Sequence, residues 1–434
     1  MPLVSRLVTH VATVTVAVVM VGAAADVMVA EIQPASCAAP LVAAAEQQIS
    51  ACLADLTTTG TVASGHTVPA DWVGLQSASA TNPAGVPGIQ IDGYFPDSST
   101  INTHHGWNHD SQFVIRLPEH WNGGLVVAGT PGNRRQYAND FTISDWVLSQ
   151  GYAYAATDKG NSGSDFHQDG VAPGDAIVEW HHRLTQLTIA TQATVLRRYG
   201  RPAERTIAAG LSNGGYLVRW QLEQVPWLYD GGVEWAGTLW SDEANLLRFL
   251  PPVLGKYPNA PEDIVAAGFP AESAPLWDYH DKTYWGSTQR IYRAEFDPDY
   301  SGAESDYDYA GRPESVRAAV RRVALTGRLR RPLLTVHGTL DALLPIGKDS
   351  DVYAAMVRAH GSDPLHRYYR VEGGNHVDGL YDSFPDLLRP LLPCFRSAFT
   401  ALETWTTTKR LPPLSATLSR PAPGQPVGTC ELGD

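Results

Sequence analysis

The sequence is poor in cysteine and in basic residues, and these shortages exclude several classes of protein. Its 434 residues include only four cysteines, whose spacings match no zinc-binding motif. Lysine and arginine number 32 against 45 aspartates and glutamates, which gives a net charge of −13. A chain this acidic is a poor partner for nucleic acid or an anionic membrane. It also lacks the glycine motifs that bind phosphate or dinucleotides, so we expect no nucleotide or redox cofactor.

Long apolar runs are missing everywhere except at the N-terminus. There, Arg6 precedes an uncharged run over residues 11–21, and Ala23-Ala24-Ala25 follows. This order is typical of a secretory signal peptide with an A-x-A cleavage site, and we predict removal of residues 1–25, or cleavage nearer Ala30. A membrane anchor is the less favoured interpretation, because the run is too short to span a bilayer. We therefore expect a secreted protein, extracellular or periplasmic, without membrane contact after cleavage.

The four cysteines suit an oxidising destination. Cys37 and Cys52 lie close together near the mature N-terminus, whereas Cys394 and Cys430 lie near the C-terminus. Four cysteines allow three pairings. We favour Cys37–Cys52 and Cys394–Cys430, each of which would close one terminal segment.

Alternating strands and helices organise most of the chain. From residue 112 onward the pattern predicts an α/β fold with a mostly parallel, doubly wound sheet, and we expect an N-terminal helix at 41–56. The alternation breaks between 240 and 325, where prolines, aromatics and acidic residues gather, which indicates a cap inserted after the sixth strand. The predicted organisation is a signal peptide (1–25), an N-terminal extension (26–110), a core in two parts (111–239 and 326–396), a cap (240–325) and a C-terminal tail (397–434).

Two segments hold residue types that can bind metals. His104, His105 and His109 cluster in one short stretch, but no helical carboxylate–histidine spacing accompanies them. We therefore interpret this stretch as a loop with hydrogen-bonded histidines.

The second such segment runs from Asp297 to Asp308 and resembles a calcium-binding loop. Oxygen ligands and a glycine fall at positions 1, 3, 5, 6 and 12 of such a loop. The last position is Asp308 instead of the usual bidentate glutamate, and Pro298 occupies position 2. An acidic surface loop is therefore favoured, with Ca²⁺ as the alternative.

Residues 205–224 carry the pattern of a nucleophilic serine. The short buried strand Thr206–Ala209 leads through Gly210, Ser212 and Gly214 (G-x-S-x-G) into an amphipathic helix. A strand that runs straight into a helix needs a tight turn, and the glycines remove the β-carbons that would clash there. Ser212 is therefore predicted to stand exposed at the sheet edge, over the free N–H groups of the helix. An ordinary strand-to-helix connector is the alternative.

A serine nucleophile needs a base and a carboxylate that orients the base. Asp341 lies in the loop after a buried strand, and His376 lies in a glycine-containing loop after the last strand. Asp341 could instead form a turn or a helix cap, and Asp242, just after the preceding strand, is a serious rival. Asp349 and Asp351 are weaker candidates because they fall in the first turn of a helix.

The oxyanion formed by serine attack needs two backbone N–H donors. Asn213, the residue after the nucleophile, should supply one, and the loop Gly129–Gly132 should supply the other. Pro131 has no N–H, so we predict Thr130, with Gly132 as the fallback. His337, on the strand that leads to Asp341, is interpreted as a packing or supporting residue.

Together these residues resemble the α/β-hydrolase superfamily over about residues 112–393. Gly129-Thr-Pro is similar to the superfamily's His-Gly-x-Pro oxyanion loop. Ser212-Asn-Gly-Gly and the secreted, capped layout are similar to 3-hydroxybutyrate-oligomer hydrolases and to the tannase/feruloyl-esterase group. The tannase pattern has cysteines beside the serine and the histidine, where this chain has Leu211 and Asn375. The resemblance implies an α/β-hydrolase fold and cleavage of carboxylic esters, such as hydroxyalkanoate oligomers or aromatic polyesters.

The sequence thus predicts a secreted serine ester hydrolase. Ser212 attacks the ester, His376 takes its proton and Asp341 orients the imidazole, while the N–H groups of Asn213 and Thr130 hold the oxyanion. Water then releases the acyl group, and no metal is expected in this site. Small, oligomeric or polymeric esters are the expected partners. A secreted serine peptidase with the same three residues and a binding protein on a hydrolase scaffold stay open as alternatives.

Overall fold

The structure is a computed structural model that describes residues 38–97, 106–107, 111–421 and 427–433. The predicted signal peptide, Cys37 and the histidines at 104, 105 and 109 lie outside these residues. The described strands are β1 (Gln47–Leu53), β2 (Gly88–Phe95), β3 (Ser111–Pro118), β4 (Gly124–Gly129), β5 (Ala153–Thr157), β6 (Arg205–Leu211), β7 (Gly231–Trp235), β8 (Leu333–Gly338), β9 (His366–Val371) and β10 (Ala416–Leu418).

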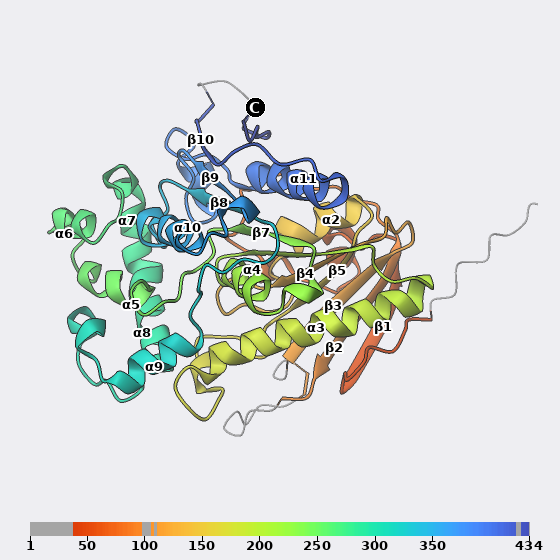
Figure 1. Ribbon diagram of the computed structural model, residues 1–434, viewed down its shortest axis with the longest axis horizontal. Coiled ribbons are helices and arrows are strands. Elements are labelled where there is room, and N and C mark those ends of the chain that lie inside the picture. The colour runs from red at the N-terminus through yellow and green to blue at the C-terminus, as the bar shows by residue number, and fades with distance from the viewer. Residues whose placement is uncertain (1–37, 98–105, 108–110, 422–426, 434) are drawn as a thin grey trace, which may run out of the picture. The chain divides into compact units, whose positions relative to one another are not determined.

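These strands form one sheet in the order β1-β2-β3-β5-β4-β6-β7-β8-β9-β10 (Figure 1). The pairs from β5 to β10 along this order are parallel, while β1, β2 and β3 join the sheet through antiparallel pairs. The mostly parallel α/β fold predicted from the alternation is therefore confirmed.

Helices cover both faces of the sheet. The described α-helices are α1 (Thr58–Ala63), α2 (Asp145–Ser149), α3 (Asp175–Tyr199), α4 (Asn213–Gln224), α5 (Leu246–Phe249), α6 (Pro261–Ala266), α7 (Ala274–His280), α8 (Gly286–Phe296), α9 (Glu314–Arg322), α10 (Ser350–Ala359) and α11 (Leu392–Thr408). In β4, Leu125 and Val127 face the core formed with α3 and α4, whereas Val126 and Ala128 face the core formed with α2 and α11. Burial on both faces explains why the central strands are almost wholly apolar.

The segment between β7 and β8 leaves the strand–helix alternation, in the region predicted as a cap. It holds α5 to α9, which lie together to one side of the sheet in Figure 1. The segment follows the seventh described strand, because β1 lies where the sequence predicts a helix. Its aromatics pack partly on one another: the ring centroid of Trp240 lies 5.4 Å from that of Tyr292 and 4.8 Å from that of Phe296.

The predicted N-terminal helix at 41–56 is wrong. Gln47–Leu53 forms β1, an antiparallel partner of β2. Alanine, leucine and glutamine favour a helix locally, but pairing with the open edge of β2 overrides this weak preference. The predicted N-terminal extension therefore supplies β1 and β2, and the predicted C-terminal tail supplies β10, so the sheet extends beyond the predicted core.

The C-terminal disulfide is present as predicted. Cys394 and Cys430 are bonded, which joins the start of α11 to the end of the chain. Cys52 is also disulfide-bonded, and Cys37, its predicted partner, lies outside the described residues. Within the part of the chain that the structure describes, no helix is both long and apolar enough to cross a membrane.

The acidic segment 297–308 does not gather its carboxylates. Asp297 accepts a hydrogen bond from Arg312 Nε at 2.5 Å, and Glu304 accepts one from Arg293 Nη2 at 2.7 Å. Asp308 caps the turn that follows it by accepting from the Ala310 N–H. Among the described residues, no three carboxylates of this segment have oxygens within 4.8 Å of one another. Calcium binding by this loop stays a prediction.

Candidate active site

Ser212 occupies a strained turn between β6 and α4. Its backbone angles are φ 55° and ψ −122°, which a non-glycine residue rarely adopts. The flanking glycines permit this turn. A β-carbon at Gly210 would lie 2.4 Å from the carbonyl carbon of Gly214, and one at Gly214 would lie 2.3 Å from Gly129 O. The predicted strand–turn–helix at the serine is therefore observed.

The structure brings Ser212, His376 and Asp341 together. His376 Nε2 lies 3.0 Å from Ser212 Oγ, and His376 Nδ1 lies 2.8 Å from Asp341 Oδ2. The three residues follow β6, β9 and β8, whose carboxyl ends lie at one edge of the sheet. Parallel strands thus deliver all three side chains to the same edge, as functional loops of such sheets do.

The rival carboxylates have other partners. Asp242 accepts from Tyr309 Oη at 2.9 Å and pairs with Arg321 Nη1 at 2.8 Å. Asp349 pairs with the buried Arg219. Asp351 accepts from the side chains of Tyr368 and Arg370. Asp341 is thus the candidate aspartate that contacts His376.

Asp341 is fully buried, and both of its oxygens accept hydrogen bonds. Oδ1 accepts from the backbone N–H groups of Leu343 and Leu344, at 2.8 and 2.7 Å. Oδ2 lies between two imidazoles, His376 Nδ1 and His337 Nε2, the latter at 2.9 Å. Burial alone would raise the pKa of Asp341, but the charges and hydrogen bonds of the two histidines hold it well below its ordinary value. The carboxylate therefore stays ionised.

His337 contacts Asp341, which agrees with its interpretation as a supporting residue. Its Nε2 faces two groups that only accept, Asp341 Oδ2 and Leu344 O (3.0 Å), so this nitrogen carries a proton. Its Nδ1 lies 2.7 Å from Ser350 Oγ, which accepts a hydrogen bond from Arg219 Nη2. The four-residue spacing between His337 and Asp341 is the one signal in the sequence that could have shown this contact.

The pKa of His337 reflects two opposing effects. Burial lowers the pKa, but the hydrogen bond and the charge of Asp341 raise it above the ordinary value overall. The carboxylate thus holds the Nε2 proton in place between the two residues.

The histidine loop is anchored without the cysteines of the tannase pattern. Trp235 Nε1 donates to His376 O at 2.9 Å, and Asn375 Oδ1 accepts from the Ala342 N–H at 3.1 Å. The second bond ties the loop after β9 to the loop that carries Asp341. Leu211, beside the serine, is buried in the core. In this chain, hydrogen bonds and packing thus hold the serine turn and the histidine loop, which a disulfide joins in the tannase pattern.

The predicted oxyanion loop lies directly against the serine turn. Asn213 Nδ2 donates to Gly132 O at 3.0 Å, and Asn213 and Gly132 both line the cavity beside the serine. Thr130 is fully buried and does not line this cavity. Its Oγ1 accepts from Lys159 Nζ at 2.7 Å, a buried contact that the sequence did not indicate. Burial lowers the pKa of Lys159 to about 7. The roles of Asn213 and Thr130 as oxyanion donors stay predictions.

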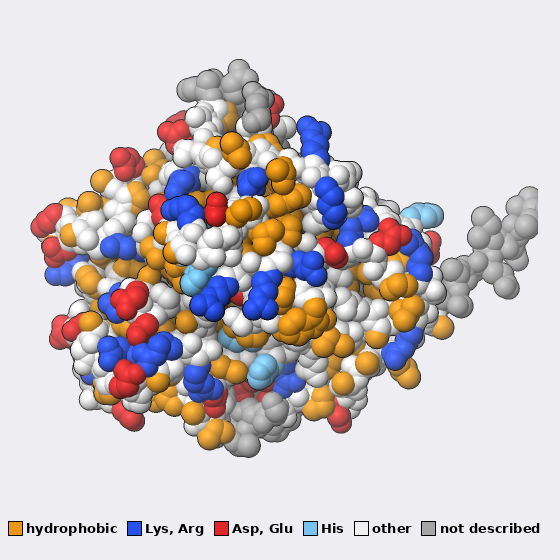
Figure 2. All heavy atoms as spheres, in the orientation of Figure 1, with side chains coloured by type: hydrophobic (Ala, Val, Ile, Leu, Met, Phe, Trp, Pro, Cys, Tyr) orange, Lys and Arg blue, Asp and Glu red, His pale blue; other side chains and the backbone are white. Residues whose placement is uncertain are grey.

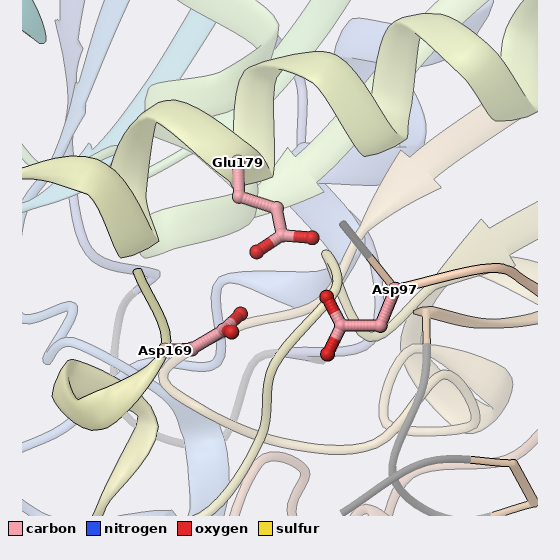
Figure 3. A group of neighbouring side chains, drawn as sticks. All are labelled: Asp97, Asp169 and Glu179. Atoms are coloured by element: carbon pink, nitrogen blue, oxygen red, sulfur yellow. The ribbon is translucent and has the colours of Figure 1, made fainter. Parts of the chain in front are cut away.

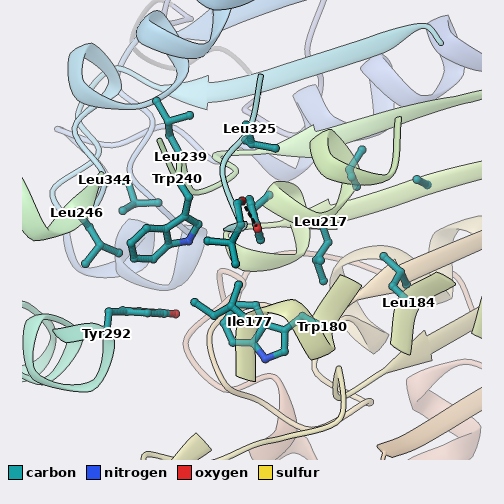
Figure 4. Packing of buried hydrophobic residues seen from close by; sticks show 14 of the residues in the cluster. Ile177, Trp180, Leu184, Leu217, Leu239, Trp240, Leu246, Tyr292, Leu325 and Leu344 are labelled. Atoms are coloured by element: carbon teal, nitrogen blue, oxygen red, sulfur yellow. Dashed lines mark hydrogen bonds between the residues drawn. The ribbon is translucent and has the colours of Figure 1, made fainter. Parts of the chain in front are cut away.

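A cavity of about 320 Å³ opens beside Ser212 and His376. Its size is at the lower end of the range for small-molecule sites. One wall is the loop 131–134, and another comes from the end of α7 through α8 of the cap region. Figure 4 shows Leu246 from this region beside Leu344, which lies in the loop that carries Asp341, and Tyr292 also lines the cavity. The segment predicted as a cap therefore lines part of the space next to the serine.

The cavity wall combines aromatic and hydroxyl side chains with two guanidinium groups. The polar and aromatic lining residues include Thr283, Tyr284, Ser287, Tyr292, Arg134 and Arg290. Burial lowers the pKa of Arg134. A site of this kind suits a small, partly apolar molecule with polar or anionic groups.

Two parts of the chain match profiles of known protein families. A profile of the family "Tannase and feruloyl esterase" matches residues 99–236, which include Ser212. A profile of the family "3HB-oligomer hydrolase (3HBOH)" matches residues 300–430, which include Asp341 and His376. Each profile covers a different part of the chain, and the two together span all three residues of the site.

The chain is 27% identical over 175 residues to mono(2-hydroxyethyl) terephthalate hydrolase from Piscinibacter sakaiensis, across 37% of this chain and 28% of that protein. The similarity thus spans less than a third of that relative's length. Feruloyl esterase B from Aspergillus oryzae has the same fold, with a TM-score of 0.56 at 14% identity over 85% of this chain and 88% of that one. Another esterase from Aspergillus oryzae gives a TM-score of 0.53 at 12% identity, over 85% and 87% of the two chains.

The mostly parallel sheet, the serine turn at its edge and the two family matches agree with one another. By its fold the chain is similar to esterases of known structure, and two parts of it match families of ester hydrolases.

Proposed function

We propose that this protein hydrolyses carboxylic esters through Ser212, His376 and Asp341. The observation that carries the proposal is the contact between Ser212 Oγ and His376 Nε2, 3.0 Å long, at the tip of a strained turn. His376 takes the serine proton as the hydroxyl attacks the ester carbonyl, and Asp341 stabilises the imidazolium that forms. His376 then protonates the departing alcohol, and the same imidazole activates a water molecule that hydrolyses the acyl-enzyme.

Backbone N–H groups stabilise the oxyanion in this proposal. Asn213 begins α4, so its N–H is not needed for the helix and can point at the negative oxygen. Thr130 or Gly132 supplies the second donor from the loop after β4. Each such donor contributes about 3 kcal/mol to transition-state stabilisation.

The proposed substrates are small esters of aromatic or hydroxyalkanoic acids. The matched families and relative bear the names of feruloyl esterases, 3HB-oligomer hydrolases and a mono(2-hydroxyethyl) terephthalate hydrolase. The cavity of about 320 Å³ suits one short acyl group more than a long chain. Arg134 and Arg290 in its wall favour an ester that also carries a carboxylate.

We also propose that the protein is exported. The N-terminal residues 1–25 have the order of a signal peptide. The disulfide Cys394–Cys430 fits an oxidising compartment.

The proposal is tested by comparing hydrolysis of p-nitrophenyl butyrate with that of an aminoacyl p-nitroanilide. We expect turnover of the ester, and a fluorophosphonate probe should label Ser212, located by peptide mass spectrometry. Turnover of the anilide alone would identify a peptidase, and failure of the probe to react would indicate a binding protein. A panel of feruloyl, mono(2-hydroxyethyl) terephthalate and 3-hydroxybutyrate oligomer esters then ranks the substrates.

Replacing His337 with leucine should lower kcat about tenfold and leave KM nearly unchanged. The change removes one hydrogen bond to a buried carboxylate, worth about 1.5–3 kcal/mol, and loosens the orientation of Asp341. His337→Gln keeps an N–H donor near the Nε2 position and should retain more of the activity. Steady-state kinetics on p-nitrophenyl butyrate checks this. Equal losses in both variants would indicate that His337 acts only through packing.

A further inference from the structure

Three carboxylates from separate parts of the chain converge beside the connection between β5 and α3. Asp97 lies two residues after β2, Asp169 lies in the β5–α3 connection, and Glu179 lies in the second turn of α3. One oxygen of each carboxylate lies within 4.8 Å of the others. Figure 3 shows the three side chains pointing toward a common space. They take no part in the proposed ester chemistry.

The cluster is buried, and Arg183 is its nearest described cation. Asp169 is 4% exposed, and the side chains of Asp97 and Glu179 are 0% and 11% exposed. Arg183 Nη2 lies 2.8 Å from Glu179 Oε1 and 3.8 Å from Asp97 Oδ1. Among the residues that the structure describes, Arg183 is the cation paired with Glu179, and buried carboxylates are costly unless a proton, a donor or a cation compensates them.

Asp169 also presents an unsatisfied oxygen to this space. Its Oδ2 accepts from Asn161 Nδ2 at 3.3 Å. Within the described ranges, its buried Oδ1 has no hydrogen-bond partner. More than 90% of buried polar groups in proteins have a partner, so this oxygen calls for one beyond the described side chains. A carboxylate oxygen can be satisfied by a donor, a shared proton or a cation.

We propose that Asp97, Asp169 and Glu179 bind a calcium ion. Calcium prefers carboxylate and carbonyl oxygens at about 2.3–2.6 Å and tolerates irregular geometry. Two oxygens on opposite sides of such an ion are about 4.8 Å apart, so the observed separations fit without large movement. Magnesium needs nearly ideal octahedral geometry at about 2.0–2.1 Å, which these fixed side chains suit less well.

The ion would hold together three segments that meet near the cavity. Asp169 lies in the connection that also contains Gly163, whose N–H donates to Asn133 O at 2.8 Å. Asn133 and Ser164 both line the cavity beside the serine. Calcium would therefore stabilise a wall of this cavity, although the site itself does not depend on the proposed ester hydrolysis.

A shared proton is the competing way to satisfy the cluster. Burial and the neighbouring carboxylate of Asp169 raise the pKa of Glu179. This is the direction that a proton shared between the two carboxylates requires. Because calcium needs ionised ligands, binding should release about one proton, and the affinity should increase with pH.

The test is calcium titration of the full-length protein after removal of metals with EDTA. We expect one calcium ion to bind in calorimetry, with proton release measured in two buffers of different ionisation enthalpy. The midpoint of thermal unfolding should rise by about 3 °C when the calcium concentration is about a hundred times the dissociation constant. Magnesium chloride should give a smaller rise.

Asp169→Asn should abolish the calcium response without lowering the unfolding temperature of the metal-free protein, because it removes one repelling charge. Asp299→Asn, in the other candidate loop, is the matched control and should keep the response. If Asp169→Asn does not fold, Glu179→Gln gives the same test. No response to calcium in the wild type, or an unchanged response in the folded variant, would overturn the site and leave the shared proton as its explanation.

Discussion

Replacing Ser212 with alanine should lower kcat for ester hydrolysis by about 10⁶-fold, and replacing Asp341 with asparagine should lower it by about 10⁴-fold. The serine provides the oxygen that forms the new bond, so alanine removes the acyl-enzyme route. The remaining hydrolysis comes from the oxyanion donors and substrate binding alone. A second change, His376→Ala, should add little to Ser212→Ala, because the imidazole then has no serine proton to accept.

The asparagine variant acts through the tautomer of His376. Asp341 Oδ2 can only accept, so His376 Nδ1 carries the proton and Nε2 is free to take the proton of Ser212. An asparagine can turn its amide N–H toward Nδ1, which leaves the proton on Nε2, where it faces the serine as a donor. In the opposite orientation, the asparagine amide N–H group faces the backbone N–H groups of Leu343 and Leu344, which donate to Oδ1 in the wild type. Donors would then face donors. Neither orientation reproduces the carboxylate.

The matched control for this series is Asp242→Asn, since Asp242 is the rival carboxylate in the sequence. Its partners Tyr309 and Arg321 belong to the cap region, and we expect kcat within about twofold of wild type. Initial rates on p-nitrophenyl butyrate and circular dichroism spectra of each variant are the measurements. Full activity in Asp341→Asn together with a large loss in Asp242→Asn would show that Asp242, and not Asp341, is the carboxylate that orients His376.

The site could be predicted because each of its residues carries a local signal. Ser212 lies between two glycines at a strand-to-helix turn, and Asp341 and His376 each follow a buried strand. Parallel strands then bring these ends together without further information. The supporting contacts could not be predicted in the same way. His337 reaches Asp341 and Ser350 only once β8 and the start of α10 have been placed.

The errors in the predicted fold also come from contacts between distant segments. Residues 47–53 carry helix-favouring side chains, and only the free edge of β2 makes them a strand. β10 is three residues long and pairs with β9 after a helix and a long loop, so it has almost no local pattern. The carboxylate cluster at Asp97 likewise joins three segments whose spacing in the sequence matches no known motif. A single sequence does not show which distant segments contact one another.

Replacing Arg219 with methionine should lower the free energy of unfolding by about 3–5 kcal/mol. Arg219 is fully buried in α4, and its guanidinium pairs with Glu234 at 2.9 Å and with Asp349 at 3.0 Å. It also donates to Ser350 and lies over the ring of Tyr353, 4.4 Å from its centroid. Methionine fills similar volume but leaves two buried carboxylates without their cation, which is far more costly than losing an exposed pair.

Two further variants serve as controls for Arg219→Met. One keeps the charge but changes the geometry of the side chain, and the other removes an exposed arginine. Arg219→Lys keeps the charge but not the planar, multiply bonded guanidinium, so its loss should be intermediate. Arg321→Met removes a cation of α9 that pairs with Asp242 and Glu314, and its side chain is 40% exposed. Figure 2 shows acidic and basic side chains mixed on the face of the molecule that it draws. We expect this variant to unfold at nearly the same urea concentration as the wild type, because exposed ion pairs contribute little to stability.

The loss in Arg219→Met should also depend on pH. Burial raises the pKa of Asp349, while Arg219 lowers it. Without Arg219, this pKa rises further above the value of about 3.9 in the unfolded chain. The folded variant then binds more protons than its unfolded form, so its stability falls as the pH rises from about 4 toward the raised pKa. The difference from wild type should therefore be larger at pH 8 than at pH 5. An equal difference at both values would mean that packing around Arg219, and not its charge, stabilises the fold.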